Sequence, residues 1–358
     1  MRSPARAGLA PNLGVKIVDE SNGLISKESG ACTDLATGSL LFLWLLPFAA
    51  ILVWGIYLVQ PEMLAALTVI PRWVWPPMGL LAALLTWRRR RMLPWRLSVI
   101  LWCLFVGVYL EEVRSMGRLA IPVTDVSPES IRLCVLSVNC SSSGTVIEDL
   151  LPDSPDLILI QESPSRDQLQ QWGEQLWGDD FGIVFAQDCA ILARGQLIET
   201  AIDRQGIYAM ARWRPTAEVE IDVTSLRLWP PPVRADYWTP DCWRSYAEVR
   251  RRQVNQIGQI LTQLASSTER LPLIVGGDFN SPAGDVSEQS LHELNLRDAF
   301  VMAGRGWGKT ITNDFPFHRI DRIWTSPSLR TISVTAHSTR HTDHRLVKCL
   351  LDISTPET

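Results

Sequence analysis

The sequence contains no CxxC pair, no internal repeat and no excess of basic residues. Its seven cysteines are scattered, a spacing that fits neither a zinc ribbon nor a dense disulfide framework. Lys and Arg number 34 against 38 Asp and Glu, which gives a formal net charge of −4. Proteins that hold long nucleic acids through many phosphate contacts are usually basic, so this balance argues against a broad polyanion-binding surface.

Charge is also missing from a long run near the N-terminus. Residues 39–59 contain no charged side chain and match the ~20 residues that a transmembrane helix needs. Further apolar stretches cover about 73–87 and 97–110. We therefore predict a disordered tail over 1–38 and a membrane anchor of two or three transmembrane helices over 39–112. The alternative, a cleaved signal followed by a buried hairpin, fits poorly because no small-residue cleavage site follows the first run.

Arginines between the second and third apolar stretches predict the orientation of the anchor. Arg88–Arg91 and Arg96 lie in this short segment, and loops rich in Arg and Lys stay on the cytoplasmic side. With three spans, the chain after Glu111 leaves on the opposite side, which predicts an extracytoplasmic domain. If the second stretch does not insert, the orientation reverses. Residues 113–130 carry charges and prolines and are predicted to form a linker.

After the linker, short apolar runs alternate with amphipathic segments. IRLCVLSV at residues 131–138 and LPLIVGG at 271–277 have the pattern of buried strands. A long amphipathic helix is expected from about residue 245 to 264, with Val254 and Ile257 on its buried face. Strands mixed with helices predict an α/β layered domain over residues 131–355.

Polar residues recur where the predicted strands end. Rigid scaffolds place catalytic groups at such positions. Taken singly, each residue has a plainer explanation, such as a turn, a solvated acid, a structural ion pair or a core histidine. Their number and order favour a single site. The set consists of Asn139, Gln161-Glu162, Asp278, Asn280, Asp321 and Thr342-Asp343-His344.

This series, with Gly277-Asp278-Phe279-Asn280 and Arg319-Ile320-Asp321 written out in full, resembles the endonuclease/exonuclease/phosphatase superfamily of DNase I-like proteins. The resemblance covers about residues 131–353. It implies a four-layer α/β sandwich of two packed β-sheets flanked by helices, here preceded by transmembrane helices. It also implies a phosphoester hydrolase that depends on Mg²⁺, with Mn²⁺ as the alternative ion, because hard oxygen ligands suit these cations.

Motif by motif, the resemblance implies which residues hold the metal and activate water. Glu162 is the main metal ligand, Asn139 lies beside it and also faces the substrate, and Asp343 is a further carboxylate near the ion. Asp278 orients or deprotonates the attacking water.

The resemblance also implies how the phosphate is handled. Asn280 bonds a phosphate oxygen, and His344 stabilises the phosphate or assists proton transfer while Asp321 holds its ring. One departure concerns a strand where the family usually has His or Tyr. This chain has Arg227 there, which can bind phosphate but cannot donate a proton at neutral pH.

Two weaker features concern a Trp-rich loop and a group of histidines. Trp243 or Trp238 is expected either to pack on a substrate or to fill a surface loop, and Trp243 is the candidate we choose. His337, His341 and His344 have a spacing that on a helix could bind zinc, but their neighbours have no helical pattern.

The leading hypothesis is a membrane-anchored hydrolase of a phosphoester in a nucleic acid, a phospholipid or a small molecule. The mild acidity and the anchor favour a small or membrane-borne substrate, while the breadth of the family keeps nucleic acid open, and no protein partner is implied. The rival is a non-catalytic binding or sensory module that keeps the fold. It predicts the loss of motif residues, yet Glu162, Asp278 and His344 are all present.

Overall fold

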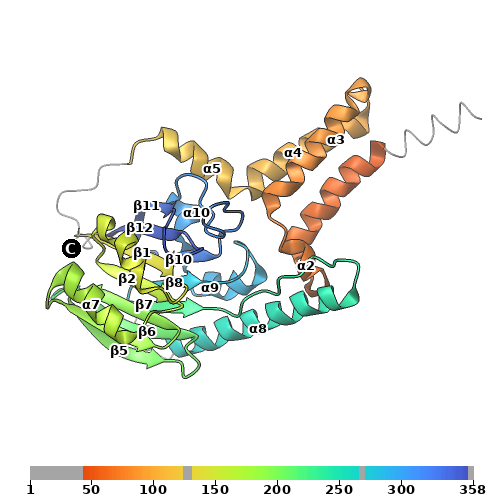
Figure 1. Cartoon of the computed structure of the whole chain (residues 1–358). Helices are drawn as coiled ribbons and strands as arrows, with labels where there is room; N and C mark the ends of the chain where they lie inside the picture. The colour runs from red at the N-terminus through yellow and green to blue at the C-terminus, as the bar shows by residue number, and fades with distance from the viewer. Residues whose placement is uncertain (1–42, 124–130, 266–270, 354–358) are drawn as a thin grey trace, which may run out of the picture.

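In the computed structural model, residues 43–123, 131–265 and 271–353 are described. The predicted tail at 1–38 and the last part of the predicted linker lie outside them. Two six-stranded sheets pack face to face, and a helical hairpin projects from one end of this body (Figure 1).

The two sheets are mixed, with both parallel and antiparallel pairs. The first has the spatial order β11 (Arg330–His337), β12 (Leu346–Ile353), β1 (Ile131–Asn139), β2 (Leu157–Gln161), β4 (Cys189–Arg194) and β3 (Phe181–Ala186). The second has the order β5 (Gln196–Ile202), β6 (Tyr208–Thr216), β7 (Val219–Arg227), β8 (Leu273–Asp278), β10 (Asp321–Thr325) and β9 (Arg297–Asp298).

Helices cover the outer face of each sheet. The α-helices of this part of the chain are α6 (Ile147–Leu150), α7 (Arg166–Trp177), α8 (Pro240–Ala265), α9 (Gln289–Glu293) and α10 (Ala299–Ala303). Short 3-10 turns are η5 (Gly144–Val146), η6 (Leu151–Asp153) and η7 (Val286–Glu288). α7 begins with a capping box in which Ser165 and Gln168 exchange side-chain and backbone hydrogen bonds.

Three apolar cores lie between the four layers of the domain. One lies between the sheets and contains Val135, Trp213 and Ile274. A second joins the first sheet to α6 and α7, and a third joins the second sheet to α8 and α9. The predicted sandwich of two packed sheets flanked by helices is therefore confirmed.

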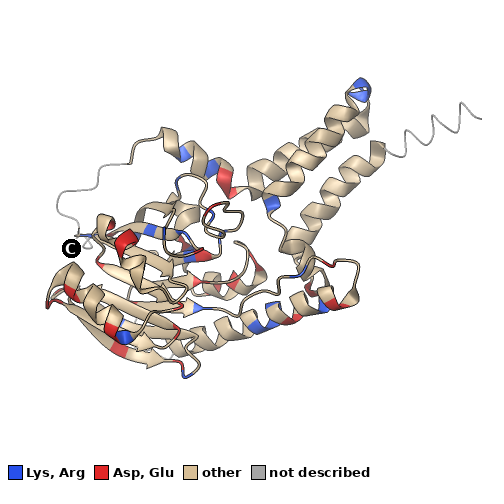
Figure 2. Ribbon diagram, viewed as in Figure 1, with Lys and Arg blue, Asp and Glu red and all other residues tan. Residues whose placement is uncertain are grey.

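The N-terminal helices comprise the helix Leu43–Val59, η1 (Glu62–Leu64), α2 (Ala65–Thr68), η2 (Arg72–Val74), α3 (Trp75–Leu85), η3 (Trp87–Arg89) and α4 (Leu93–Tyr109). The helix Leu43–Val59, α3 and α4 share a separate apolar cluster, whereas α2 packs against α8. α3 and α4 pack so closely that a Cβ at Gly79 would overlap the ring of Trp102. Figure 2 shows the basic residues at the tip of this hairpin and almost none along its helices.

Within the described ranges, no single helix has both the length and the apolar composition to cross a bilayer. Two bent pairs meet both requirements together: Leu43–Val59 with Glu62–Thr68, bent by 118°, and Leu93–Tyr109 with Glu111–Ala120, bent by 66°. α3, which covers most of the predicted second span, belongs to neither pair.

The beginning of the predicted linker is helical and lies against the sandwich. α5 (Glu111–Gly117) and η4 (Arg118–Ala120) follow α4, and α5 contacts α10. Arg118 donates hydrogen bonds to the carbonyl oxygens of Gly304 and Val301. The part of 113–130 that the structure describes is thus attached to the domain.

Candidate active site

Strands from both sheets bring the predicted polar residues to one end of the sandwich. β1 and β2 are parallel, with Asn139 opposite Gln161. Asn139 is therefore a neighbour of Glu162, the residue that follows Gln161. β7 and β8 are also parallel, with Arg227 opposite Asp278, and antiparallel β10 places Asp321 beside Asp278. Residues separated by up to two hundred positions in the chain therefore share one site.

Asn139 connects the two sheets at this site. Its Nδ2 donates to Glu162 Oε1 at 3.0 Å and to Asp278 Oδ2 at 3.1 Å. Its Oδ1 accepts a hydrogen bond from the backbone N–H of Ser141. Because Asn139 is fully buried, these bonds set the orientation of its amide and the spacing of the two carboxylates.

The backbone before Asp278 leaves no room for a side chain. Gly277 has φ +147°, and a Cβ at this position would overlap the carbonyl oxygen of Leu226 on β7. The close approach of β7 and β8 therefore requires glycine, which explains the second glycine of the Gly276-Gly277-Asp278 sequence.

Asp278 has an environment suited to exchanging protons. Burial, together with the nearby charge of Asp321, raises the pKa of Asp278 to about 7. Asn280 holds this carboxylate, because its backbone N–H donates to Oδ1 at 2.9 Å and its Nδ2 donates to Oδ2 at 3.1 Å. The second N–H of the Asn280 amide donates to Leu228 O, so both amide protons are engaged within the protein.

His344 and Asp321 form a buried pair. Nδ1 of His344 lies 2.9 Å from Asp321 Oδ2 and 3.1 Å from Oδ1. Burial by itself lowers the pKa of His344, but the Asp321 carboxylate reverses this and raises it to about 9. The ring is therefore an imidazolium at neutral pH, with Nδ1–H directed at Asp321.

Glu162 is paired with the residue that departs from the family pattern. Arg227 Nη2 donates to Glu162 Oε1 at 2.7 Å, and Nη1 donates to Asp188 Oδ2 at 2.9 Å. Sequence reasoning missed Asp188, which lies in the turn between β3 and β4, where a single acid carries no signal. Arg227 thus brings a permanent positive charge to the predicted metal ligand.

Asp343 is hydrogen-bonded to the loop that follows β1. Ser141 Oγ donates to Asp343 Oδ1 at 2.8 Å, and Thr342 Oγ1 donates to the carbonyl oxygen of Asn139 at 2.8 Å. Ser141 was not among the predicted residues. These bonds attach the Thr342-Asp343-His344 segment to the end of β1.

Two groups of residues offer ligands for a cation. One potential ligand atom from each of Asp278, Asp321 and His344 lies within 4.8 Å of the other two. A protonated His344 has no lone pair for a metal, however. Glu162 Oε2 makes no hydrogen bond with any described residue, and its side chain is 28% exposed. The carboxylate of Glu162, beside the amide of Asn139, therefore fits a hard cation such as Mg²⁺ better.

The structure does not bring two of the sequence candidates into this site. Trp243 packs with Tyr237 near α2, and its Nε1 donates to Tyr237 O. Trp238 is 83% exposed. Of the three histidines, His337 contacts Thr335 and His341 contacts Glu148, so they do not share a set of ligands with His344.

Comparison with solved structures finds similar folds at low sequence identity. An endonuclease/exonuclease/phosphatase family protein from Bacteroides thetaiotaomicron is 16% identical, over 63% of this chain and 99% of that one, with a TM-score of 0.49. A mannosyl-6-phosphatase from the same organism is 17% identical, over 61% and 99%, with a TM-score of 0.47. A humanised TDP2 from D. rerio is 14% identical, over 62% and 98%, with a TM-score of 0.46.

No curated protein matches the sequence. The model of the endonuclease/exonuclease/phosphatase family matches residues 136–344, which is more than half of the chain. This segment begins within β1 and ends at His344, so it contains all of the site and both sheets except for β12 and the first residues of β1. The chain therefore belongs to the endonuclease/exonuclease/phosphatase family.

Proposed function

We propose that the protein is a membrane-anchored, metal-dependent phosphoester hydrolase whose catalytic domain lies outside the cytoplasm. The observation that carries the proposal is the convergence of Asn139, Glu162, Asp278 and the Asp321–His344 pair at one end of the two sheets. A family member that had become a binding module would have no need to keep this complete set.

The cation is expected at Glu162, with Asn139 beside it and Asp343 near it. When bound, Mg²⁺ or Mn²⁺ would neutralise phosphate oxygens and so lower the barrier to attack. Arg227 adds a second positive charge at the same carboxylate.

Asp278 is the group best placed to accept a proton from the attacking water. Its raised pKa, about 7, makes it a stronger base than an exposed carboxylate and leaves a large ionised fraction at neutral pH. Asn139 and Asn280 bond the carboxylate and hold it in one orientation. Asn280 therefore acts by positioning Asp278, and the phosphate contact that the family resemblance implies would need one of its two amide hydrogen bonds to be released.

His344 provides positive charge for the phosphate and a proton for the leaving group. Its Nδ1 is hydrogen-bonded to Asp321, whereas Nε2 makes no hydrogen bond with a described residue. Arg227 cannot donate a proton at neutral pH, so His344 carries that role among the side chains of the site.

The anchor is supported by exposed apolar surface on the N-terminal helices. Leu58 and Val59 are each 70% exposed and Leu85 is 79% exposed, an arrangement that is costly in water and favourable in lipid. Arg88–Arg91 at the hairpin tip favour a cytoplasmic tip, which places the base of the hairpin and the sandwich on the opposite side.

Hydrolysis of bis-p-nitrophenyl phosphate by the full chain in detergent tests the chemistry. We expect turnover that requires Mg²⁺ or Mn²⁺, stops with EDTA and falls by about 10²–10⁴-fold in Asp278→Asn. Activity of the wild type no greater than that of the variant would favour the non-catalytic module. A panel of DNA, phospholipid and sugar phosphate then distinguishes the substrate classes.

A further inference from the structure

A cavity of about 580 Å³ lies where the N-terminal helices meet the sandwich. It is lined by the ends of two apolar helices, at Tyr57 and Tyr109, and by the segments around Pro282–Asp285 and Phe317–Arg319. Its size is typical of small-molecule sites, which span ~300–1,000 Å³. None of its lining residues belongs to the candidate active site.

Most of the surface area of the lining is apolar. Trp73, Val108, Met302 and Phe317 contribute to it. Trp324, also in the lining, is fully buried, and its indole Nε1 has no hydrogen-bond partner among the described residues. A buried donor without an acceptor is costly, so an oxygen within the cavity would stabilise it.

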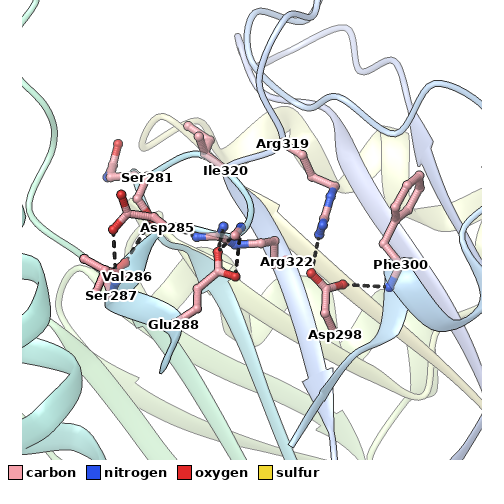
Figure 3. Close-up of polar contacts among 12 residues, drawn as sticks. Ser281, Asp285, Val286, Ser287, Glu288, Asp298, Phe300, Arg319, Ile320 and Arg322 are labelled. Carbon is pink, nitrogen blue, oxygen red and sulfur yellow. Dashed lines mark hydrogen bonds and ion pairs between the residues drawn. The ribbon is translucent and has the colours of Figure 1, made fainter. Parts of the chain in front are cut away.

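The carboxylates that line the cavity are already neutralised. Figure 3 shows Glu288 directed at Arg322 and Asp298 at Arg319. The other three are paired as well: Glu111 with Arg319, Glu112 with Lys309, and Asp285 with Arg250.

Three cations in the lining are not neutralised in this way. Arg72, Arg114 and Arg297 form no ion pair with any residue that the structure describes. Arg72 is held in place, since its guanidinium lies 5.4 Å from the ring centroid of Tyr57 and 5.6 Å from that of Tyr109 and donates to Gly284 O. The cavity therefore combines apolar walls with unneutralised positive charge.

We propose that this cavity binds an acidic phospholipid from the surrounding bilayer, with its phosphate at Arg72 and Arg114 and the start of its acyl chains against the apolar lining. The inference rests on the proposed membrane anchor. The position supports a lipid because the cavity is lined by the ends of the apolar helices and by the domain, and for an anchored protein phospholipid head groups lie at that level.

The test compares the full chain in phosphatidylcholine nanodiscs with and without phosphatidylglycerol, and native mass spectrometry counts the lipids retained. We expect the wild type to retain one phosphatidylglycerol in preference to phosphatidylcholine. Arg72→Gln/Arg114→Gln should lower this preference by roughly 10-fold or more, as expected for two cations that face a lipid phosphate. If the loss of Arg72 disturbs folding, Arg114→Gln alone is measured instead and should also lower the preference for phosphatidylglycerol.

Arg88→Gln/Arg91→Gln is the matched control, because it removes two positive charges at the hairpin tip, whereas the cavity is lined by residues at the other end of the hairpin (Figure 2). An equal loss of preference in this control would overturn the proposal. So would a wild type that co-floats with vesicles after alkaline extraction yet shows no preference for phosphatidylglycerol. Failure of the wild type to co-float would instead overturn the anchor, and this inference with it.

Discussion

Arg227 shows how one residue can change the chemistry of a family site. Its planar guanidinium reaches two carboxylates at once, Glu162 and Asp188, which a single ammonium group cannot reproduce. Burial opposes the charge, but Asp188 and Glu162 outweigh it and raise the pKa of Arg227 further. Arg227 is therefore expected to supply fixed positive charge at the position where the family resemblance implies a titratable proton donor.

Arg227→Lys is expected to lower kcat/KM for a generic phosphodiester by about 10–100-fold, because the ammonium can bridge only one carboxylate. Asp188→Asn should have a smaller effect, since Arg227 would keep its bond to Glu162. Steady-state kinetics over a range of Mg²⁺ concentrations measure both. Arg252→Lys, in an exposed pair on α8, is the control and should be neutral; wild-type kinetics in Arg227→Lys would contradict the assignment.

His318 is expected to make the stability of the fold depend on pH. Burial, together with the charge of Lys309, lowers the pKa of His318 to about 4 from an ordinary value of 6.5. Between these values the unfolded chain binds a proton that the folded chain does not, so stability falls as the pH drops through this window.

Lowering the pH from about 7 to about 5 should therefore lower the Tm of the full chain in detergent, and His318→Gln should reduce part of that loss. The contribution is on the order of 1–3 kcal/mol. His337→Gln, at an exposed histidine on β11, serves as the control and should behave like the wild type. Identical pH dependence of His318→Gln and wild type would contradict this account.

At the scale of single elements, α5 attaches the N-terminal helices to the segment before β10. Glu111 accepts two hydrogen bonds from Arg319, at 2.9 and 2.6 Å, and lies 3.2 Å from Lys309 Nζ. Lys309 precedes Thr310, whose Oγ1 accepts hydrogen bonds from the backbone N–H groups of Ile320 and Asp321. Contacts thus run from α5 to Asp321, which is hydrogen-bonded to His344.

Glu111→Gln is expected to lower the free energy of unfolding by about 2–4 kcal/mol. This is less than the ~3–5 kcal/mol typical of breaking a buried pair, because Asp298 stays 2.8 Å from Arg319. Thermal melting in detergent measures the change. Arg114→Gln, on the exposed part of the same helix, should change stability by no more than about 0.5 kcal/mol; equal effects of the two variants would show that α5 is not held through Glu111.

For α8, the pattern of apolar residues predicts the helix but not its first residue or all of its buried side chains. The helix starts at Pro240, before the predicted start near residue 245, and Val254 is exposed where it was expected to be buried. Arg250 and Gln253 are buried instead. Gln253 donates to the carbonyl oxygens of Trp229 and Asn280, and Arg250 pairs with Asp285. α8 thus meets the loop after β8 through polar contacts, and its first turns pack on Ala65 and Ala66 of α2 through an apolar cluster.

For the whole molecule, the proposed anchor predicts that the catalytic domain lies on the side of the membrane opposite to the arginines of the hairpin tip. Alkaline phosphatase fused after Thr358 should be active and green fluorescent protein at the same position should be dark, because the domain is proposed to leave the cytoplasm. Fusions truncated after Arg91 should give the reverse result and act as the control. A fluorescent C-terminal fusion would show that the domain is cytoplasmic and that α3 does not insert.

Local chemistry in the sequence was enough to predict a layered α/β domain and the polar residues at its strand ends, whereas the four layers were predicted from the family resemblance. Periodicity identifies buried strands without reference to the rest of the chain, and motifs such as Gly277-Asp278-Phe279-Asn280 reflect backbone and ligand requirements within a few residues. Only the tertiary structure showed that Asp188 supports Arg227, that Glu111 belongs to the domain and that Trp243 packs near α2. These contacts join segments separated by tens to hundreds of residues, and their energies depend on burial and charge pairing, which exist only after the chain has folded.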